Sequence, residues 1–310
     1  MDERMAWRVS LHGGHSGEFC DHAEGTLREI LLAAVQAGYH TFGVSEHMPR
    51  GADRFLYPQE IALGWDMARI EADFARYAEI LPVLVEELAG QLIVLRGFEA
   101  EVVPEANYAE RIQRLRAWQM PDGTPRFDYC VGSVHYVHEI QLDGPVDAYL
   151  QAAEACGGIE ALAIRYYETV AAMIETIRPE VVGHLDLIKR NLRAAGFEPE
   201  EIATPRVDAA MQNALEAARA CGAILDLNTA GWRKGLGEPY PSPTIVRKAS
   251  AMGVGFCFGD DSHRPTEVGA GVDAARIYLL QCGVQEVTVL TRESREPLAP
   301  VVRRRVSLQG

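Results

Sequence analysis

Short apolar runs alternate with helical patterns along most of the 310 residues, and this rhythm restricts the possible folds more than any other feature. The runs fit buried strands, and the segments between them carry apolar residues at helical spacing. Consecutive strand–helix units build a mainly parallel sheet covered by helices. Seven such strands are expected, and their regular spacing favours a barrel of βα units over an open sheet. They lie in the segments WRVSL, TFGVS, QLIVLRGFE, FDYCVGSVH, VVGH, AILDLNT and VGFCFGD.

Several helices are readable in the segments between these strands. A helix from about Thr26 to Ala37 begins with a capping box, because Thr26 stands three residues before Glu29, and Gly38 suits its C-terminal end. A second pattern covers about residues 64–88, where Pro82 is expected to kink or break the helix. Two further helical patterns cover roughly residues 146–177. The VTVLT segment near the C-terminus predicts an additional strand without a defined place.

The chain has the composition of an ordinary soluble globular protein, with 48% hydrophobic and 24% charged residues. We find no repeat, low-complexity segment or convincing linker. The sequence therefore predicts a single domain over residues 1–310, with an insertion around residues 50–90 that covers the barrel mouth. Oligomeric state leaves no readable signal.

Charge and cysteine usage restrict the partners and the compartment. The formal net charge of −14 disfavours binding to a nucleic-acid backbone, so no nucleic-acid partner is expected, and an anionic substrate would need local positive charge. No signal peptide and no apolar run near 20 residues is found, so no membrane partner is expected. The six cysteines are scattered without a C-x-x-C pair, which favours reduced thiols and a cytoplasmic protein.

Histidines and carboxylates gather just after the predicted strands. The chain contains nine histidines, and seven of them follow a strand in this way. In barrels of βα units the loops after the strands converge on one face, where active sites lie. Strand three contributes Glu99 and Glu101, and strand seven contributes Asp260 and Asp261 beside a histidine. The seven histidines are His12, His15, His22, His47, His135, His184 and His263.

This set of side chains predicts a shared metal site. Imidazole and carboxylate are ligands of zinc, iron and manganese, and seven histidines with two carboxylates exceed the needs of one ion. The count indicates two or three ions. Clustered divalent charge would attract a phosphate dianion, and two ions can stabilise an in-line displacement at phosphorus. From the residues alone, the chain is expected to be a metal-dependent hydrolase with a preference for phosphate esters.

The ordered motifs resemble those of one family. The segments HGGHSGEFCDHA, GVSEHMPR, GFEAE, VGSVH, GHLDLIK, LNTAGWRK and GDDSH, which extend over residues 12–263, are similar to the motifs of the polymerase-and-histidinol-phosphatase (PHP) superfamily, histidinol-phosphatase type. The resemblance implies an α/β fold, a distorted seven-stranded TIM-like (β/α) barrel. It also implies three divalent metal ions, which can be zinc, iron or manganese.

The resemblance also implies a ligand set. Asp261 is preferred to Asp260 because family members read D-x-H, the spacing of Asp261 and His263. Glu99 would bridge two ions. The family opens with H-x-H, whereas this chain has the longer H-G-G-H, and its two glycines can accommodate a bulge that still directs both imidazoles inward. The implied ligands are His12, His15, His22, His47, Glu99, His135, His184, Asp261 and His263.

Substrate residues are carried over in the same way. Arg50 and Arg233 match basic positions around the barrel mouth, and a guanidinium suits bidentate phosphate binding. Asn228 is expected to bond the substrate or to hold Arg233. Asp186 is expected either to orient His184 or to protonate the leaving alkoxide. Glu99, Asp186 and Asp261 form the expected catalytic set.

The resemblance favours hydrolysis of L-histidinol phosphate to histidinol and phosphate, through attack by a metal-bound hydroxide, in histidine biosynthesis. Three alternatives remain open. The chain could be a PHP phosphoesterase for another phosphate mono- or diester or an oligonucleotide end. It could be an amidohydrolase-type C–N hydrolase, although His135 stands where that family would require a bridging lysine. It could also be a metal-binding protein without catalysis.

Overall fold

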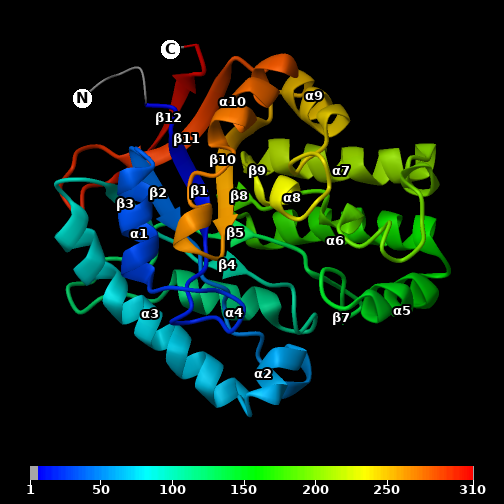
Figure 1. Ribbon diagram of the computed structural model, residues 1–310, viewed down its shortest axis with the longest axis horizontal. Helices are drawn as coiled ribbons and strands as arrows, with labels where there is room; N and C mark the ends of the chain where they lie inside the picture. Colours follow the sequence, from blue (N-terminus) through cyan, green and yellow to red (C-terminus); the bar gives the residue numbers. More distant parts are fainter. Residues whose placement is uncertain (1–5, 310) are drawn as a thin grey trace.

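A computed structural model describes residues 6–309 and contains one large parallel sheet covered by helices (Figure 1). The strand order is β3-β2-β1-β10-β9-β8-β5-β4, and every neighbouring pair in this sheet is parallel. The α/β architecture expected from the sequence is confirmed. The strands are β1 Val9–Gly14, β2 Thr41–Val44, β3 Ile93–Arg96, β4 Glu99–Ala100, β5 Val131–Gly132, β8 Val181–Val182, β9 Ile224–Asn228 and β10 Gly255–Ser262.

The predicted third strand, QLIVLRGFE, forms two short strands that explain the curl of this sheet. β3 pairs with β2 and β4 pairs with β5, although only Gly97 and Phe98 separate β3 from β4. An additional parallel bridge joins His47 to Glu99. Since β3 and β4 stand at opposite ends of the strand order, the sheet must curl until its two ends adjoin. The carboxyl ends of its strands therefore converge.

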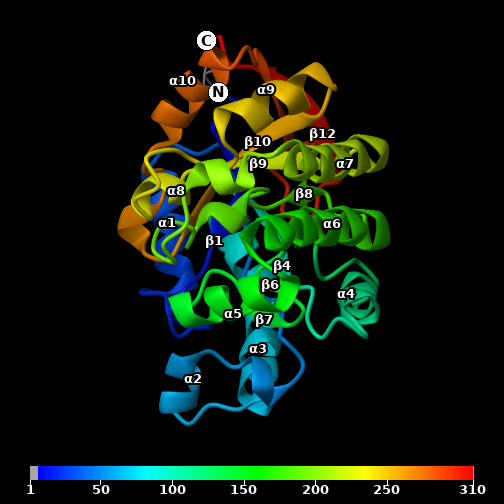
Figure 2. The same cartoon turned by 90° about the vertical axis from the view of Figure 1, so that its right-hand side faces the viewer.

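Helices pack against the outside of the curled sheet, and α6 and α7 lie side by side in both views (Figures 1 and 2). Their apolar stripes join the strands in one buried core. No helix within residues 6–309 is long and apolar enough to cross a membrane. The helices are α1 Leu27–Gln36, α2 Pro58–Ala62, α3 Met67–Leu88, α4 Tyr108–Arg116, α5 Val146–Cys156, α6 Ile159–Ile177, α7 Pro205–Cys221, α8 Ala230–Arg233, α9 Pro243–Ala251 and α10 Val272–Gln281.

The capping box predicted for the first helix is confirmed. The Thr26 hydroxyl accepts a hydrogen bond from the Glu29 backbone N–H at 3.2 Å, and the Glu29 carboxylate accepts one from the Thr26 N–H at 2.7 Å. These two bonds satisfy backbone donors that have no partner inside the helix. Gly38, with φ of 75°, follows the end of α1 as expected.

The break expected at Pro82 is wrong, because α3 runs without interruption from Met67 to Leu88. A proline inside a helix removes the hydrogen bond to the carbonyl four residues earlier, which here is that of Ala78. The Arg126 guanidinium donates a hydrogen bond of 3.1 Å to this carbonyl and satisfies it from outside the helix. A distant side chain therefore replaces the partner that the proline removes.

Two hairpins lie outside the large sheet. The VTVLT segment is confirmed as a strand, β11 Glu286–Arg292, which pairs with antiparallel β12 Val301–Ser307. Arg292 of β11 forms a 2.7 Å ion pair with Asp128, whose side chain is 6% exposed and also pairs with Arg96 at the end of β3, so this hairpin is fixed to the sheet. The second hairpin, β6 Tyr136–Val137 with β7 Ile140–Gln141, follows β5.

Candidate metal centre

A cavity of about 550 Å³ opens where the strands end, and most of the predicted ligands line it. His12 is fully buried among them, with 0% exposure, and stands at the end of the apolar part of β1. The structure thus brings together all nine side chains of the predicted ligand set. Those that line the cavity are His15, His22, His47, Glu99, His135, His184, Asp261 and His263.

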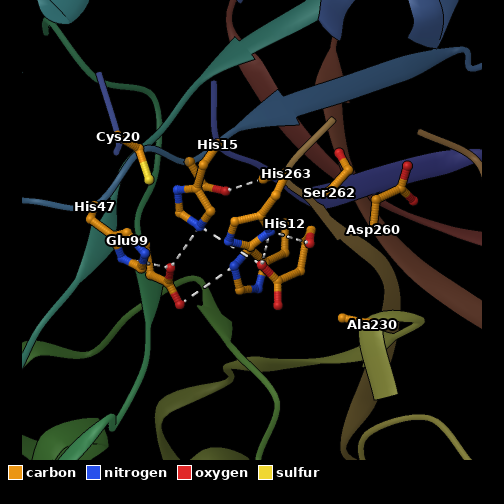
Figure 3. Close-up of polar contacts among 12 residues, drawn as sticks. His12, His15, Cys20, His47, Glu99, Ala230, Asp260, Ser262 and His263 are labelled. Carbon is orange, nitrogen blue, oxygen red and sulfur yellow. Dashed lines mark hydrogen bonds and ion pairs between the residues drawn. The ribbon is translucent and has the colours of Figure 1, made fainter. Parts of the chain in front are cut away.

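Glu99 lies between two groups of histidines (Figure 3). One carboxylate oxygen, Oε1, is 3.4 Å from His12 Nε2 and 3.2 Å from His184 Nε2. The other oxygen, Oε2, is 3.3 Å from His15 Nε2 and 3.1 Å from His47 Nδ1. Each oxygen therefore faces its own set of imidazoles, the arrangement required of a carboxylate that bridges two ions.

The spacing of these atoms suits a metal ion better than hydrogen bonds alone. Two atoms that bind one zinc-sized ion at about 2.1 Å lie roughly 3.0–3.4 Å apart at common coordination angles. His135 Nε2 and His184 Nε2 are 3.1 Å apart. His12 Nε2 and Glu99 Oε1 are buried without a hydrogen-bond partner among the described residues. A divalent cation would satisfy these atoms, and the donor set fits it.

A third group of side chains lies beside the first two. The imidazole of His22 is 5.0 Å from that of His263, measured between ring centroids, and His263 is 4.8 Å from His15. Asp261 Oδ1 lies 3.9 Å from His263 Nδ1 and 3.7 Å from His15 Nε2. Cys20 adds a sulfur 2.9 Å from His22 Nδ1, which the scattered cysteine pattern did not indicate.

Two further carboxylates, Glu101 and Asp226, hold the histidines in place. Glu101 accepts a 2.6 Å hydrogen bond from His135 Nδ1. Asp226 pairs with His12 Nδ1 at 2.8 Å, and its second oxygen accepts the His184 backbone N–H at 2.6 Å. Such outer partners fix the orientation and the tautomer of a ligating imidazole. Glu101 was visible in the GFEAE motif, whereas sequence reasoning missed Asp226, which precedes Asn228 on β9.

We expect Asp226→Asn to weaken metal binding by about 10- to 100-fold, the usual effect of losing an outer carboxylate. An amide keeps the shape of the side chain but cannot accept hydrogen bonds from both His12 and His184. Metal titration followed by calorimetry measures the change. Asp273→Asn is the matched control, because Asp273 is exposed and Arg8 is its only ion-pair partner within residues 6–309. Equal affinity in the two variants would show that Asp226 does not orient the ligands.

The pKa values in the cluster are shifted strongly by mutual charge. Burial opposes protonation of His47, but Glu99 and Glu101 outweigh it and raise its pKa to about 10. Burial also opposes the charged form of His135, but Glu101 and then Asp143 raise its pKa to about 9. Burial favours neutral Glu101, yet His135 and His47 lower its pKa to about 2. The carboxylates therefore stay ionised, and nearby positive charge stabilises them.

Two residues of the cluster have strained backbones. His184 has φ of 24° and Asp261 has φ of 46°, values that residues with a side chain rarely adopt. Such strain concentrates at functional sites, where the surrounding structure fixes it. Neighbouring Asp260 is turned away from the cluster, and its carboxylate accepts bonds from Tyr39 and the Gly269 N–H (Figure 3). Of the two adjacent aspartates, the structure places Asp261 in the centre.

The H-G-G-H segment contains the expected bulge. β1 continues to Gly14, and its register against β10 shifts both before and after His12. Gly14 has φ of 102°, and an added Cβ would lie 2.0 Å from the Ser262 carbonyl oxygen, so only glycine fits there. The bulge lets His12 and His15 both reach Glu99.

Arg233 is the predicted basic residue that the structure brings to the cavity. Its guanidinium donates to the backbone carbonyls of Asp260 and Asp261 at 2.5 and 3.0 Å, which fixes it beside the centre. Lys234 also lines the cavity, and no carboxylate within residues 6–309 forms an ion pair with it. Sequence reasoning missed Lys234, although it ends the quoted LNTAGWRK motif.

Three other predicted residues have different surroundings. Arg50 is buried, forms an ion pair with Glu60 and stacks on the Tyr57 ring, and it is absent from the described lining of the cavity. Buried Asn228 donates to the carboxylates of Asp226 and Asp261 at 3.0 and 3.3 Å, and it does not bond Arg233.

Asp186 is likewise absent from the described lining of the cavity. One of its oxygens accepts the Ser242 backbone N–H at 2.9 Å and pairs with Lys189 at 2.9 Å. Asp186 forms no hydrogen bond with His184; Asp226 accepts the His184 backbone N–H, and His184 Nδ1 is buried without a hydrogen-bond partner among residues 6–309. The expectation that Asp186 orients the His184 imidazole stays a prediction.

A curled α/β sheet with imidazoles and carboxylates around a cavity at its carboxyl edge is the arrangement of a protein that can bind divalent metal ions. Residues 12–230 match the PHP domain family. The chain belongs to this family, as its ordered motifs predicted.

The sequences of known relatives align with this chain over most of their length. The probable histidinol-phosphatase of Schizosaccharomyces pombe is 30% identical over 92% of this chain and 90% of its own. The histidinol-phosphatase of Saccharomyces cerevisiae is 27% identical over 92% of both chains. The crystal structure of histidinol phosphate phosphatase from Lactococcus lactis, complexed with zinc, L-histidinol and phosphate, has a TM-score of 0.67 at 18% identity and covers 92% of this chain and 97% of its own. This last likeness shows a shared fold.

Proposed function

We propose that the chain is a metal-dependent phosphatase that hydrolyses L-histidinol phosphate to histidinol and phosphate. The observation that carries the proposal is Glu99, whose two oxygens face separate histidine groups beside the cations Arg233 and Lys234. Such a cavity combines several metal ligands with positive charge, of which Arg233 is paired with Glu267 at 3.7 Å and Lys234 has no ion-pair partner within residues 6–309, as a phosphate monoester requires. The relatives from two yeasts are named for this activity.

We propose three divalent ions, of zinc, iron or manganese. Three groups of donors support this number. The first combines His12, His184 and His135 with one oxygen of Glu99, and the second combines His15 and His47 with the other oxygen. His22, His263 and Asp261 form the third group. When bound, the ions would supply a water-derived nucleophile at neutral pH and positive charge for the phosphoryl oxygens.

The protein's own side chains would position the substrate. Arg233 is held by backbone carbonyls and can present its guanidinium to the phosphate, and Lys234 adds a second positive charge. Glu101 and Asp226 keep the imidazoles oriented, so the centre needs little reorganisation during the reaction. Arg50, Asn228 and Asp186 would act indirectly, by fixing residues around the cavity.

We also propose the finer features of the architecture and its setting. β3 and β4 would count as two halves of one strand, which gives a distorted seven-stranded barrel in a single domain. Tyr57, Pro58 and Gln59 line the cavity, in support of a mouth-covering insertion within residues 50–90. The free state of the six cysteines supports a cytoplasmic location.

The test measures metal per chain and phosphate release from L-histidinol phosphate, beside a generic ester such as p-nitrophenyl phosphate. We expect close to three metal ions per chain and a kcat/KM that is clearly higher for histidinol phosphate. Metal binding with activity on other esters alone would exclude this substrate and retain the phosphatase. Absence of metal and of activity after reconstitution would refute the proposed function.

A further inference from the structure

One carboxylate in the cavity has no place in the chemistry proposed above. Asp143 lines the cavity just after β7, together with Gln141. Its only side-chain hydrogen bond among the described residues comes from Gln141 Nε2, at 3.3 Å from Oδ1. No lysine or arginine of residues 6–309 lies in ion-pair range of it. A carboxylate without a cationic partner therefore faces a site built for an anion.

The position of Asp143 is fixed by its neighbours. The Leu142 N–H donates to the His135 carbonyl at 2.8 Å. The side-chain amide of buried Asn191 donates to the carbonyls on both sides of Asp143, those of Leu142 at 2.8 Å and Gly144 at 2.9 Å. The backbone on either side of the carboxylate is thus held in place before any ligand arrives, as a specific binding residue requires.

The two kinds of charge enter the cavity from different elements. Arg233 and Lys234 come from α8 and its end, whereas Asp143 follows β7, and α8 lies above β7 in both views (Figures 1 and 2). The charge of Lys234 lowers the pKa values of Asp261 and His263, whereas the charge of Asp143 raises those of His135 and Tyr57. Glu267 lines the cavity 3.7 Å from Arg233, whereas Lys234 and Asp143 have no ion-pair partner within residues 6–309. The cavity therefore offers an unpaired cation and an unpaired carboxylate from different elements, which suits a ligand with both charges.

A carboxylate near a phosphate site lowers the affinity for a simple phosphate ester, because like charges repel. It is useful only when the ligand also carries a cation. Histidinol phosphate has such a group, an aliphatic amine one carbon from the ester-bearing carbon. Amines of this kind are protonated at neutral pH, whereas an imidazole with a pKa of about 6.5 is mostly neutral.

We propose that Asp143 determines specificity by binding the ammonium group of the substrate. This inference rests on the proposed function and names the part of the cavity that recognises the amine. The second carboxylate oxygen, Oδ2, accepts the ammonium N–H, while Gln141 holds Oδ1. Phosphate monoesters without an amine are bound less well, because they leave the half-buried carboxylate of Asp143 in the cavity without a cation.

The experiment compares the metal-loaded wild type with Asp143→Asn on two esters, L-histidinol phosphate and its amine-free analogue 3-(imidazol-4-yl)propyl phosphate. Asparagine keeps the size of the side chain and the Asn191 bonds to the neighbouring backbone. We expect kcat/KM for histidinol phosphate to fall about 10- to 100-fold, mainly through KM, since a charged hydrogen bond is lost. The amine-free ester should be hydrolysed equally well or better. Metal content should not change.

Asp147→Asn is the matched control, since Asp147 is exposed in the first turn of α5, outside the cavity lining. It should leave both esters unaffected. An equal loss on both esters in Asp143→Asn, or an unchanged preference for the amine, would overturn the assignment. A loss confined to kcat on both esters would point to proton transfer and would equally overturn it.

A second pair of esters, 2-aminoethyl phosphate and ethyl phosphate, separates this inference from the proposed function. If the wild type does not hydrolyse histidinol phosphate, the proposed function fails. A preference for the aminoethyl ester that disappears in Asp143→Asn would still support the ammonium site. Absence of any such preference in the wild type would refute it.

Discussion

Replacing Glu99 with alanine should abolish phosphatase activity and lower the metal content of the protein. Glu99 is 1% exposed, and its two oxygens contact two separate groups of histidines. Its loss removes a shared ligand and leaves several imidazoles to repel one another if charged. We expect kcat/KM to fall by at least about 100- to 1,000-fold, the cost of removing one preorganised electrostatic contact. Phosphate release and metal analysis on the same preparation measure both effects.

Two further variants separate ligation from packing. Glu99→Gln keeps the volume of the side chain, so activity lost in both substitutions points to the charge of the carboxylate. Glu105→Gln is the control, because Glu105 is exposed six residues further along the same segment. A fully active and fully metallated Glu99→Ala protein would show that Glu99 does not bridge the groups.

Replacing Arg50 with alanine should destabilise the protein by about 3–5 kcal/mol, because it leaves the carboxylate of Glu60 buried without its partner. Arg50 and Glu60 are 3% and 2% exposed, and Glu60 also accepts the Tyr57 N–H at 2.6 Å. The guanidinium lies 3.9 Å from the Tyr57 ring centroid, so a cation–π contact is lost as well. Urea unfolding of the metal-loaded protein measures the change.

Arg54→Ala is the matched control for this prediction. Arg54 pairs with Glu139 at 2.9 Å, but its side chain is 60% exposed, so its loss should cost at most about 1 kcal/mol. Combining Arg50→Met with Glu60→Gln should restore much of the stability, because neither buried charge remains. Unchanged stability of Arg50→Ala with weaker phosphate binding would instead support the role that the sequence motif implied.

The gathering of the proposed ligands was predictable because topology decides their place. Side chains that follow parallel strands must meet at one edge of the sheet, whatever their separation in sequence. His47 and His184 are 137 positions apart, yet both contact the same carboxylate, Glu99. The order of the motifs predicted which side chains the fold brings together, and the spacing D-x-H predicted that Asp261 faces them and Asp260 does not.

The surroundings of the basic and outer residues could not be predicted in this way. The side chain of Arg50 turns toward Glu60 because the 57–60 segment folds back over it, a tertiary contact that no periodicity records. Continuity of α3 through Pro82 likewise depends on Arg126, which lies 44 positions away. Asp143 was missed because nothing in its local sequence distinguishes it from a loop aspartate. Its proposed role follows from its position in the cavity lining, which only the folded structure reveals.

The bulge in β1 restores the direction of a side chain that an additional residue would otherwise turn to the opposite face. In a regular strand alternate residues share a face, so H-x-H directs both imidazoles to one side, whereas histidines three positions apart would point to opposite sides. The register shifts on either side of His12 absorb the additional residue, and both rings still reach Glu99. The additional residue would turn one imidazole to the opposite face of the strand, and the bulge turns it back. A sequence pattern that requires H-x-H would therefore pass over these two histidines, although both of their imidazoles reach the same carboxylate.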